Sequence, residues 1–278
     1  MITHRQRLAA RQTRRGLRTA IAIVLLALML FPVYWMLNIS LQASGTTLPS
    51  TFLPTHPSLA GYATAIHDQG QNLVTSMLIA IGTVVLTLLI ATPCAYALAQ
   101  FRFRWISWAL LAILISQMIP GIVIANALYT LYENIGLLNS IPGLIIANAA
   151  NAVPFGILIM RSFMLAVPTS IVEAARVNGA GLVRAFLSIV VPISRNSLIT
   201  VGLFAFLFAW SDFIFALTLT TKGNITPVTL GIYTYLGAHI SNWSAVMATA
   251  MLASIPAIIL LVIAQKYIAA GATGGAVK

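Results

Sequence analysis

The sequence has 278 residues, of which 60% are hydrophobic and 7% are charged, and its formal net charge is +11. A soluble globular domain carries about 25% charged residues, so this chain lacks the polar surface needed to cover a core in water. The composition therefore predicts an integral membrane protein. Nucleic-acid binding is excluded because the basic residues fall in short clusters between long uncharged stretches, with no basic face interleaved with aromatic residues.

Six apolar runs are each long enough to cross a bilayer as a helix, which takes about 20 residues. They cover residues 19–41, 73–99, 106–130, 141–163, 196–220 and 243–265. The predicted fold class is all-α, a polytopic membrane protein with six transmembrane helices, and kinks are expected at Pro120-Gly121 and Pro154. Residues 1–18 and 268–278 are predicted to be tails, and 19–267 to be the transmembrane domain.

The distribution of Lys and Arg predicts the orientation, because short cytoplasmic loops collect basic residues. Every basic residue except Lys222 lies in alternate segments between the predicted spans: the N-terminal tail, the turn near 102–104, the 161–195 segment and the C-terminal segment. Both termini and the 161–195 segment are therefore predicted to face the cytoplasm, in a multi-pass protein of the cytoplasmic (inner) membrane.

The 168–192 segment, PTSIVEAARVNGAGLVRAFLSIVVP, is too polar to span and too apolar to be a disordered linker. It is predicted to form two short helices. Ser170 and Glu173 have the spacing of a capping box, and the first helix, 171–178, is expected to end at Gly179. The second helix is expected to run over 182–190 and to stop at Pro192.

This segment resembles the cytoplasmic loop signature, or EAA motif, of binding-protein-dependent ABC importer permeases. Glu173-Ala174-Ala175 is followed by Gly179, Ile189 and Val191-Pro192 at the family spacing, with Val in place of the usual Leu. Trp210-Ser211-Asp212-Phe213 and the closing 265–278 segment are similar to segments of the carbohydrate, maltose-type (MalG-like) branch. Gln42 departs from the family, where many relatives have Lys.

The resemblance implies the type I ABC importer permease fold and a subunit that is not an enzyme. The sequence has no G-x-x-x-x-G-K-[ST] phosphate loop, so ATP and Mg are expected on two partner ATP-binding subunits, with no cofactor and no metal on this chain. The residues expected to contact those subunits are Glu173, Ala174, Ala175, Arg176, Asn178, Gly179, Ala180 and Pro192 in the coupling loop, and Gly274, Gly275, Ala276, Val277 and Lys278 in the tail. The other implied partners are a second homologous permease forming a heterodimer, an extracytoplasmic sugar-binding protein and the lipid bilayer, with no nucleic acid.

Polar and aromatic residues within the spans are the candidates for the path of a neutral sugar, which is recognised by hydrogen bonds and ring surfaces. They are Gln117, Asn126, Tyr129, Asn148, Asn151, Trp210 and Asp212. Asn148 and Asn151 are predicted to share a helix face, and Tyr129 and Trp210 to offer stacking surfaces. Helix–helix hydrogen bonding is the alternative role for these amides. For Asp212, a charge within a span, support of a gate is favoured over sugar binding.

The predicted function is therefore a permease that forms half of the pathway for a di- or oligosaccharide. A glycerophosphodiester or a polyol is the alternative substrate. A secondary transporter or channel is a weaker reading, because few ionisable groups within the spans are present to couple to protons and the 168–192 loop would have no purpose. An intramembrane hydrolase would need a Ser–His or paired-Asp arrangement within the spans, which the positions of these residues do not offer.

Overall fold

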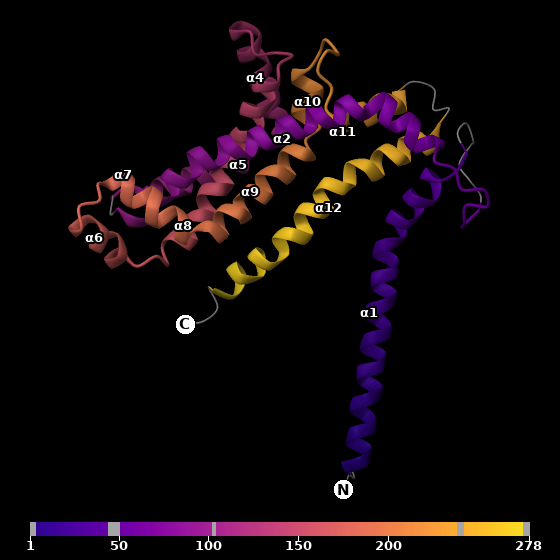
Figure 1. Ribbon diagram of the computed structural model, residues 1–278, viewed down its shortest axis with the longest axis horizontal. Helices are drawn as coiled ribbons and strands as arrows, with labels where there is room; N and C mark the ends of the chain where they lie inside the picture. The colour runs from indigo at the N-terminus through magenta and orange to yellow at the C-terminus, as the bar shows by residue number, and fades with distance from the viewer. Residues whose placement is uncertain (1–3, 44–50, 102–103, 238–241, 275–278) are drawn as a thin grey trace. The chain divides into compact units, whose positions relative to one another are not determined.

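The computed structural model describes residues 4–43, 51–101, 104–237 and 242–274 of the chain, and within these ranges the regular secondary structure is helical (Figure 1). In chain order the elements are α1 (His4–Ser40), α2 (Ala60–Gln100), α3 (Ile106–Ser116), α4 (Gly121–Ile135), α5 (Ile141–Met164), α6 (Thr169–Val177), α7 (Leu182–Ala185), the π-helix η1 (Phe186–Val190), α8 (Val191–Ile193), α9 (Arg195–Trp210), α10 (Ile214–Leu219), α11 (Val228–Gly237) and α12 (Trp243–Gly274). The predicted all-α class is confirmed.

Four helices, α1, α2, α5 and α12, contain stretches long and apolar enough to cross a membrane. Two bent pairs pass the same test when each pair is taken together: α3 with α4, and Leu182–Ile193 with α9. Counting each pair as one span gives up to six spans in the described residues, which agrees with the predicted number. The helix α1 begins at His4, so the predicted tail is helical over its described part.

The span predicted over 106–130 is divided into α3 and α4 at Pro120-Gly121, where a kink was expected. The chain bends by 93° between α3 and α4, and Pro120 is the residue that precedes α4. Proline lacks the N–H that would continue the preceding helix and disfavours helical geometry in the residue before it, which explains the break that the Pro120-Gly121 pair predicted. Pro154 lies inside α5, which the structure describes as one helix over Ile141–Met164.

The predicted span 196–220 is also interrupted. The helix α9 ends at Trp210, Ser211 to Phe213 are not helical, and α10 resumes at Ile214. Two polar residues, Ser211 and Asp212, lie in this interruption, and the run is apolar on both sides of them.

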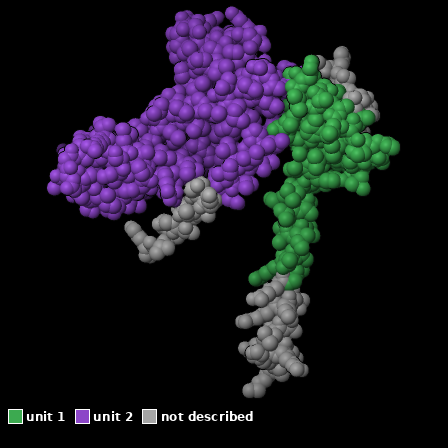
Figure 2. Space-filling view, viewed as in Figure 1, with its two compact units in different colours: residues 1–68, 238–252 green, residues 69–237, 253–278 purple. Residues whose placement is uncertain are grey.

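The chain divides into two compact units, residues 1–68 with 238–252 and residues 69–237 with 253–278 (Figure 2). In the first unit, the segment after α1 returns to the end of that helix. Asn38 donates its side-chain amide to the Thr51 carbonyl at 3.0 Å, and the Ser40 and Tyr62 hydroxyls lie 2.9 Å apart. These bonds provide hydrogen-bond partners for buried polar side chains at the end of α1, which water does not reach.

The second unit holds two separate groups of buried side chains that matter for the site. One, the α4–α10 core, joins Ile79, Tyr132, Leu144 and Phe215 from α2, α4, α5 and α10, and Figure 1 shows α4 beside α10. The other, the loop core, includes Met160 from α5, Val172 from α6, Val190 from η1 and Val201 from α9. The predicted coupling loop therefore packs on the helical bundle instead of standing apart from it.

Candidate coupling loop and transport pathway

The turn after α6 is built around Gly179, the residue at which the sequence predicted the helix to end. Gly179 has a φ of +87°, a left-handed conformation that costs a residue with a Cβ about 1–2 kcal/mol. The Gly179 amide donates to the Arg176 carbonyl and the Ala180 amide donates to the Ala175 carbonyl, each at 3.0 Å. This is the Schellman arrangement, and it reverses the chain sharply between α6 and α7.

The two faces of α6 differ in environment. Val172 is buried and Ala175 is half-buried against the loop core, and their spacing of three residues places them on one face. Glu173, Ala174 and Arg176 are exposed. The small residue Ala175 therefore allows α6 to lie close to its own bundle, while Ala174 leaves the outward face flat.

The start of α6 differs from the prediction. The helix begins at Thr169 after Pro168, and no side chain caps it, so the predicted capping box between Ser170 and Glu173 is wrong. Ser170 lies within the first turn instead of before it, and Pro168 occupies the N-cap position with an extended backbone (φ −62°, ψ 128°). The Glu173 side chain is thus not used as a cap and is exposed to solvent.

The second half of the loop is longer and less regular than predicted. Instead of one helix ending at Pro192, a short α7 leads into η1, and Pro192 lies at the start of α8. A π-helix closes its hydrogen bonds one residue later than an α-helix and is frequent at functional sites. Proline is tolerated in the first turn of a helix, so Pro192 lies at the start of α8 and does not end a helix here.

A hollow of about 540 Å³ opens on the surface of the loop. Its lining comes from the end of α6, the turn and the start of α7: Glu173, Arg176, Val177, Gly179, Ala180, Gly181 and Leu182. Four of the eight loop residues expected to contact an ATP-binding subunit line it, and Ala174, Asn178 and Pro192 are exposed nearby in the chain, while Ala175 faces the loop core. In the predicted tail, Gly274 is the last residue of α12, and Gly275, Ala276, Val277 and Lys278 lie outside the described residues.

Asp212 organises the interruption of the fifth apolar run. Its two carboxylate oxygens accept hydrogen bonds from the Phe215 and Ala216 amides, each at 3.1 Å, and the Asn148 side chain also bonds to it. The Thr229 hydroxyl donates to the Asp212 backbone carbonyl at 2.6 Å. The carboxylate therefore holds the first turn of α10.

Several of the predicted pathway residues occupy environments that differ from the prediction. Asn148 is buried, and its amide donates to the Leu144 carbonyl as well as reaching Asp212, whereas Asn151 is exposed. Asn148 and Asn151 lie three residues apart in α5, and the α4–α10 core covers the helix near Asn148 and ends before Asn151. Tyr129 packs against the same core.

The prediction of Trp210 as a stacking surface for sugar is wrong. The Trp210 side chain is buried, its ring stacks on Phe206 with centroids 5.4 Å apart, and its indole N–H donates to the Ala253 carbonyl at 2.9 Å. Both its ring face and its polar atom are used in joining α9 to α12, so neither is free for a ligand.

An aromatic cluster that was not identified from the sequence lies between α5 and α9. Phe155 of α5 contacts Phe204 and Phe208 of α9 at centroid distances of 5.2 and 5.4 Å, in edge-to-face geometry. Phe204 is half-buried and Phe208 is exposed. Exposed Asn151 lies one turn before Phe155, and the Gln117 side chain donates to the Asn151 carbonyl at 3.5 Å. Asn126, on α4, is exposed. The signal in the sequence was the F-x-x-x-F spacing of 204 and 208, which reads equally well as ordinary lipid-facing residues.

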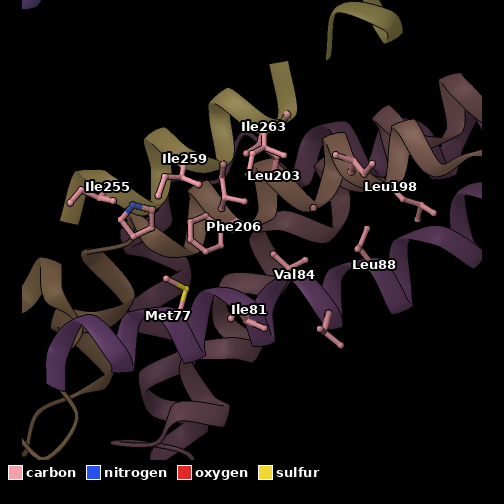
Figure 3. A pocket seen from close by; sticks show the side chains of 16 residues that line it. Met77, Ile81, Val84, Leu88, Leu198, Leu203, Phe206, Ile255, Ile259 and Ile263 are labelled. Atoms are coloured by element: carbon pink, nitrogen blue, oxygen red, sulfur yellow. The ribbon is translucent and has the colours of Figure 1, made fainter. Parts of the chain in front are cut away.

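A second hollow in the second unit has a different character (Figure 3). It measures about 700 Å³ and lies between α2, α9 and α12, with lining side chains such as Met77, Leu88, Phe206 and Ile259 that are all apolar. A sugar needs several polar partners to replace its hydration, so this groove is not a sugar site.

Comparison with known proteins identifies relatives along nearly the whole chain. The family model described as binding-protein-dependent transport system inner membrane component matches residues 91–273. The chain is 35% identical to a probable ABC transporter permease of Sinorhizobium fredii, over 97% of this chain and 98% of the relative. It is 31% identical to the sulfoquinovosyl glycerol transport system permease SmoH of Agrobacterium fabrum, over 95% and 94%. It is 29% identical to the trehalose/maltose transport system permease MalG of Thermococcus litoralis, over 92% and 94%.

The fold has a solved counterpart. A chain in the crystal structure of a bacterial ABC transporter involved in the import of the acidic polysaccharide alginate superposes with a TM-score of 0.78, covering 96% of this chain and 99% of that one at 21% identity. At this level of identity the likeness concerns the arrangement of helices, and it agrees with the fold predicted from the sequence.

Proposed function

Since the chain belongs to the family of binding-protein-dependent transport system inner membrane components, we propose that it forms half of the translocation pathway of an ATP-driven ABC importer for a carbohydrate. In this proposal the chain spans the inner membrane several times with both termini in the cytoplasm. It pairs with a second, homologous permease and receives substrate from an extracytoplasmic binding protein. Two ATP-binding subunits hold ATP and Mg, and this chain hydrolyses nothing.

The observation that carries the coupling role is the exposed apolar surface of the loop. Val177 is 88% exposed, and Leu182 and Val183 after the turn are exposed as well. This surface lies on a segment predicted to face the cytoplasm, where lipid tails are not available to cover it. Contiguous exposed apolar surface rimmed by polar groups marks a protein-binding site, and exposed Glu173 and Arg176 supply that rim. We assign the surface to an ATP-binding subunit, with the tail residues Gly274 to Lys278 as a second contact.

Substitution of Val177 tests this assignment. Val177→Asp places a charge on the exposed surface, so the permease should fold and insert normally. Burying an unpaired charge against a partner is strongly unfavourable, so the amount of ATP-binding subunit that co-purifies with the permease should fall at least about tenfold. Thr169→Asp, on the exposed first turn of the same helix, is the matched control and should leave co-purification unchanged. Equal co-purification of the wild type and the Val177→Asp variant contradicts the proposal.

The substrate class rests on relatives whose names include trehalose, maltose and a sulfoquinovosyl glycoside. We propose a di- or oligosaccharide, and a glycerophosphodiester or polyol is the alternative. Titration calorimetry of the cognate binding protein against maltose, trehalose, glycerol and a glycerophosphodiester separates these classes. Binding of only the last two would overturn the sugar assignment.

The half-buried rings of Phe155 and Phe204 and the exposed ring of Phe208, with the amides of Asn151 and Gln117, are the proposed pathway surface of this subunit. Aromatic rings stack on the apolar faces of sugars, and the apolar area covered in this way stabilises by about 25 cal/mol per Å². Phe208→Ala should therefore lower uptake of the bound sugar by about two- to tenfold at equal amounts of assembled complex, and Phe208→Tyr should restore it. Trp210→Phe keeps an aromatic ring at a buried position and should leave the apparent KM unchanged. A changed KM for Trp210→Phe with none for Phe208→Ala would reverse this assignment.

A further inference from the structure

The C-terminal ends of α2 and α5 are joined by side chains that reach across in both directions. The amide of Gln100, the last residue of α2, donates to the carbonyls of Met164 at 3.1 Å and Val167 at 3.3 Å. In the opposite direction, the Nε of Arg161 in α5 donates to the Leu98 carbonyl of α2 at 3.0 Å. Each helix end is thus hydrogen-bonded by a side chain of the other helix.

This exchange has a clear electrostatic basis. The last carbonyls of a helix lack partners within it and form the negative end of the helix dipole. Two C-terminal ends side by side repel each other unless donors lie between them. Gln100 supplies a neutral donor and Arg161 a cation, and a cation at a helix C-terminus stabilises it. The carbonyls of Leu98 and Met164 belong to buried residues, so bonds to them are screened little by water.

The joined ends connect directly to the coupling loop. Val167, an acceptor for Gln100, immediately precedes Pro168 and the start of α6. On the other side of the loop, Tyr96 of α2 packs against Phe186 of η1 with ring centroids 5.1 Å apart. The entry to α6 is therefore hydrogen-bonded to α2, and the segment after the turn is packed on it.

We propose that Gln100 and Arg161 are positioning residues that form a reciprocal clamp, through which α2 moves together with the coupling loop when the ATP-binding subunits displace α6. The inference rests on the proposed coupling function. Without the clamp, α6 could move relative to α2, and the displacement would be absorbed at the hinge between Val167 and Thr169 instead of reaching the spans.

Spin labels on the full complex in nanodiscs test the clamp. The labels are attached at Leu89→Cys on the exposed side of α2 and at Thr169→Cys on the exposed first turn of α6, in a Cys94→Ser background. Their separation is measured without nucleotide and with Mg-ATP and vanadate. Gln100→Met removes the donor at similar length, and Gln100→Lys keeps a donor and adds a cation. Gln71→Met makes the same change at an exposed position on the same helix.

In the protein with Gln100 unchanged, in Gln100→Lys and in Gln71→Met, the distance between the two spin labels should be the same without nucleotide and with Mg-ATP and vanadate. With Gln100→Met it should shift on addition of Mg-ATP and vanadate by about 2 Å, the scale of helix shifts in switching proteins. No shift in Gln100→Met, or a separation already altered without nucleotide and insensitive to it, overturns the clamp. Failure of ATP-binding subunits to co-purify with the wild-type permease would instead overturn the proposed function.

Discussion

Gly179 shows how one backbone conformation shapes the candidate coupling site. Its φ of +87° and the two hydrogen bonds around it end α6 and direct the chain into α7. A Cβ added at this position meets no atom within 4 Å, so the requirement for glycine is conformational and not steric. The turn at Gly179 was thus predictable from the sequence, because a glycine directly after a helical pattern is a common sign of this turn.

Substitution at Gly179 should separate conformation from size. Gly179→Val forces a β-branched residue into the left-handed region, and co-purification of the ATP-binding subunits and ATP-driven uptake should both fall by about tenfold or more. Gly179→Asn should retain most of both, because Asn tolerates this conformation. Gly181, with a φ of −65° and open space around it, is the matched position, and Gly181→Val should be mild. If Gly181→Val and Gly179→Val lower co-purification and uptake equally, the loss is caused by side-chain bulk and not by backbone conformation.

At the scale of helices, close packing of α2, α5 and α9 depends on small residues. A Cβ at Gly156 of α5 would lie 2.9 Å from Val201 Cγ1 and 3.3 Å from Ala91 Cβ. A Cβ at Gly202 of α9 would lie 3.5 Å from Val84 Cγ1, which is an ordinary contact. In a membrane, helices associate largely through such close approach of small residues, so these positions hold the bundle that carries the loop core.

The two glycines should respond differently to enlargement. Gly156→Leu overfills the junction and should cost about 1–3 kcal/mol of stability, seen as a lower midpoint of thermal unfolding in detergent. Gly202→Ala should be neutral or stabilising by up to about 1 kcal/mol, since alanine favours the helix more than glycine. A midpoint lowered more by Gly202→Ala than by Gly156→Leu would contradict this packing.

The same elements show where sequence reasoning stops. The break at Pro120-Gly121 was foreseeable because proline ends helices by its covalent structure. The break at Ser211 to Phe213 combines local bonds from the Phe215 and Ala216 amides to the Asp212 carboxylate with contacts from Asn148 and Thr229. Those two residues lie in distant parts of the chain, so their contacts were not foreseeable from the sequence. Judged from the sequence alone, Trp210 and Phe208 are equally suited to bind a sugar. Only the structure shows that the Trp210 indole is already hydrogen-bonded to α12.

For the whole molecule, the orientation inferred from charge is open to direct measurement. In a Cys94→Ser background, Lys222→Cys in the loop after α10 should react with a membrane-impermeant thiol reagent added outside intact cells or spheroplasts. Val177→Cys, exposed on the coupling loop, should react only after the cytoplasmic face is opened. The reverse pattern would invert the proposed topology.

Length, composition and the placement of Lys and Arg were sufficient to predict a six-span helical membrane protein and the loop on which its coupling role is proposed. These properties are readable because solvation by lipid requires long apolar runs and because the EAA spacing lies within one short segment. The environments of the polar and aromatic side chains were decided by the tertiary structure alone. Asn148, Asp212, Trp210 and the Phe155 cluster acquire their surroundings from partners far along the chain, and the Gln100–Arg161 clamp joins positions more than 60 residues apart. Such pairings depend on which helix faces meet, and local sequence does not specify that.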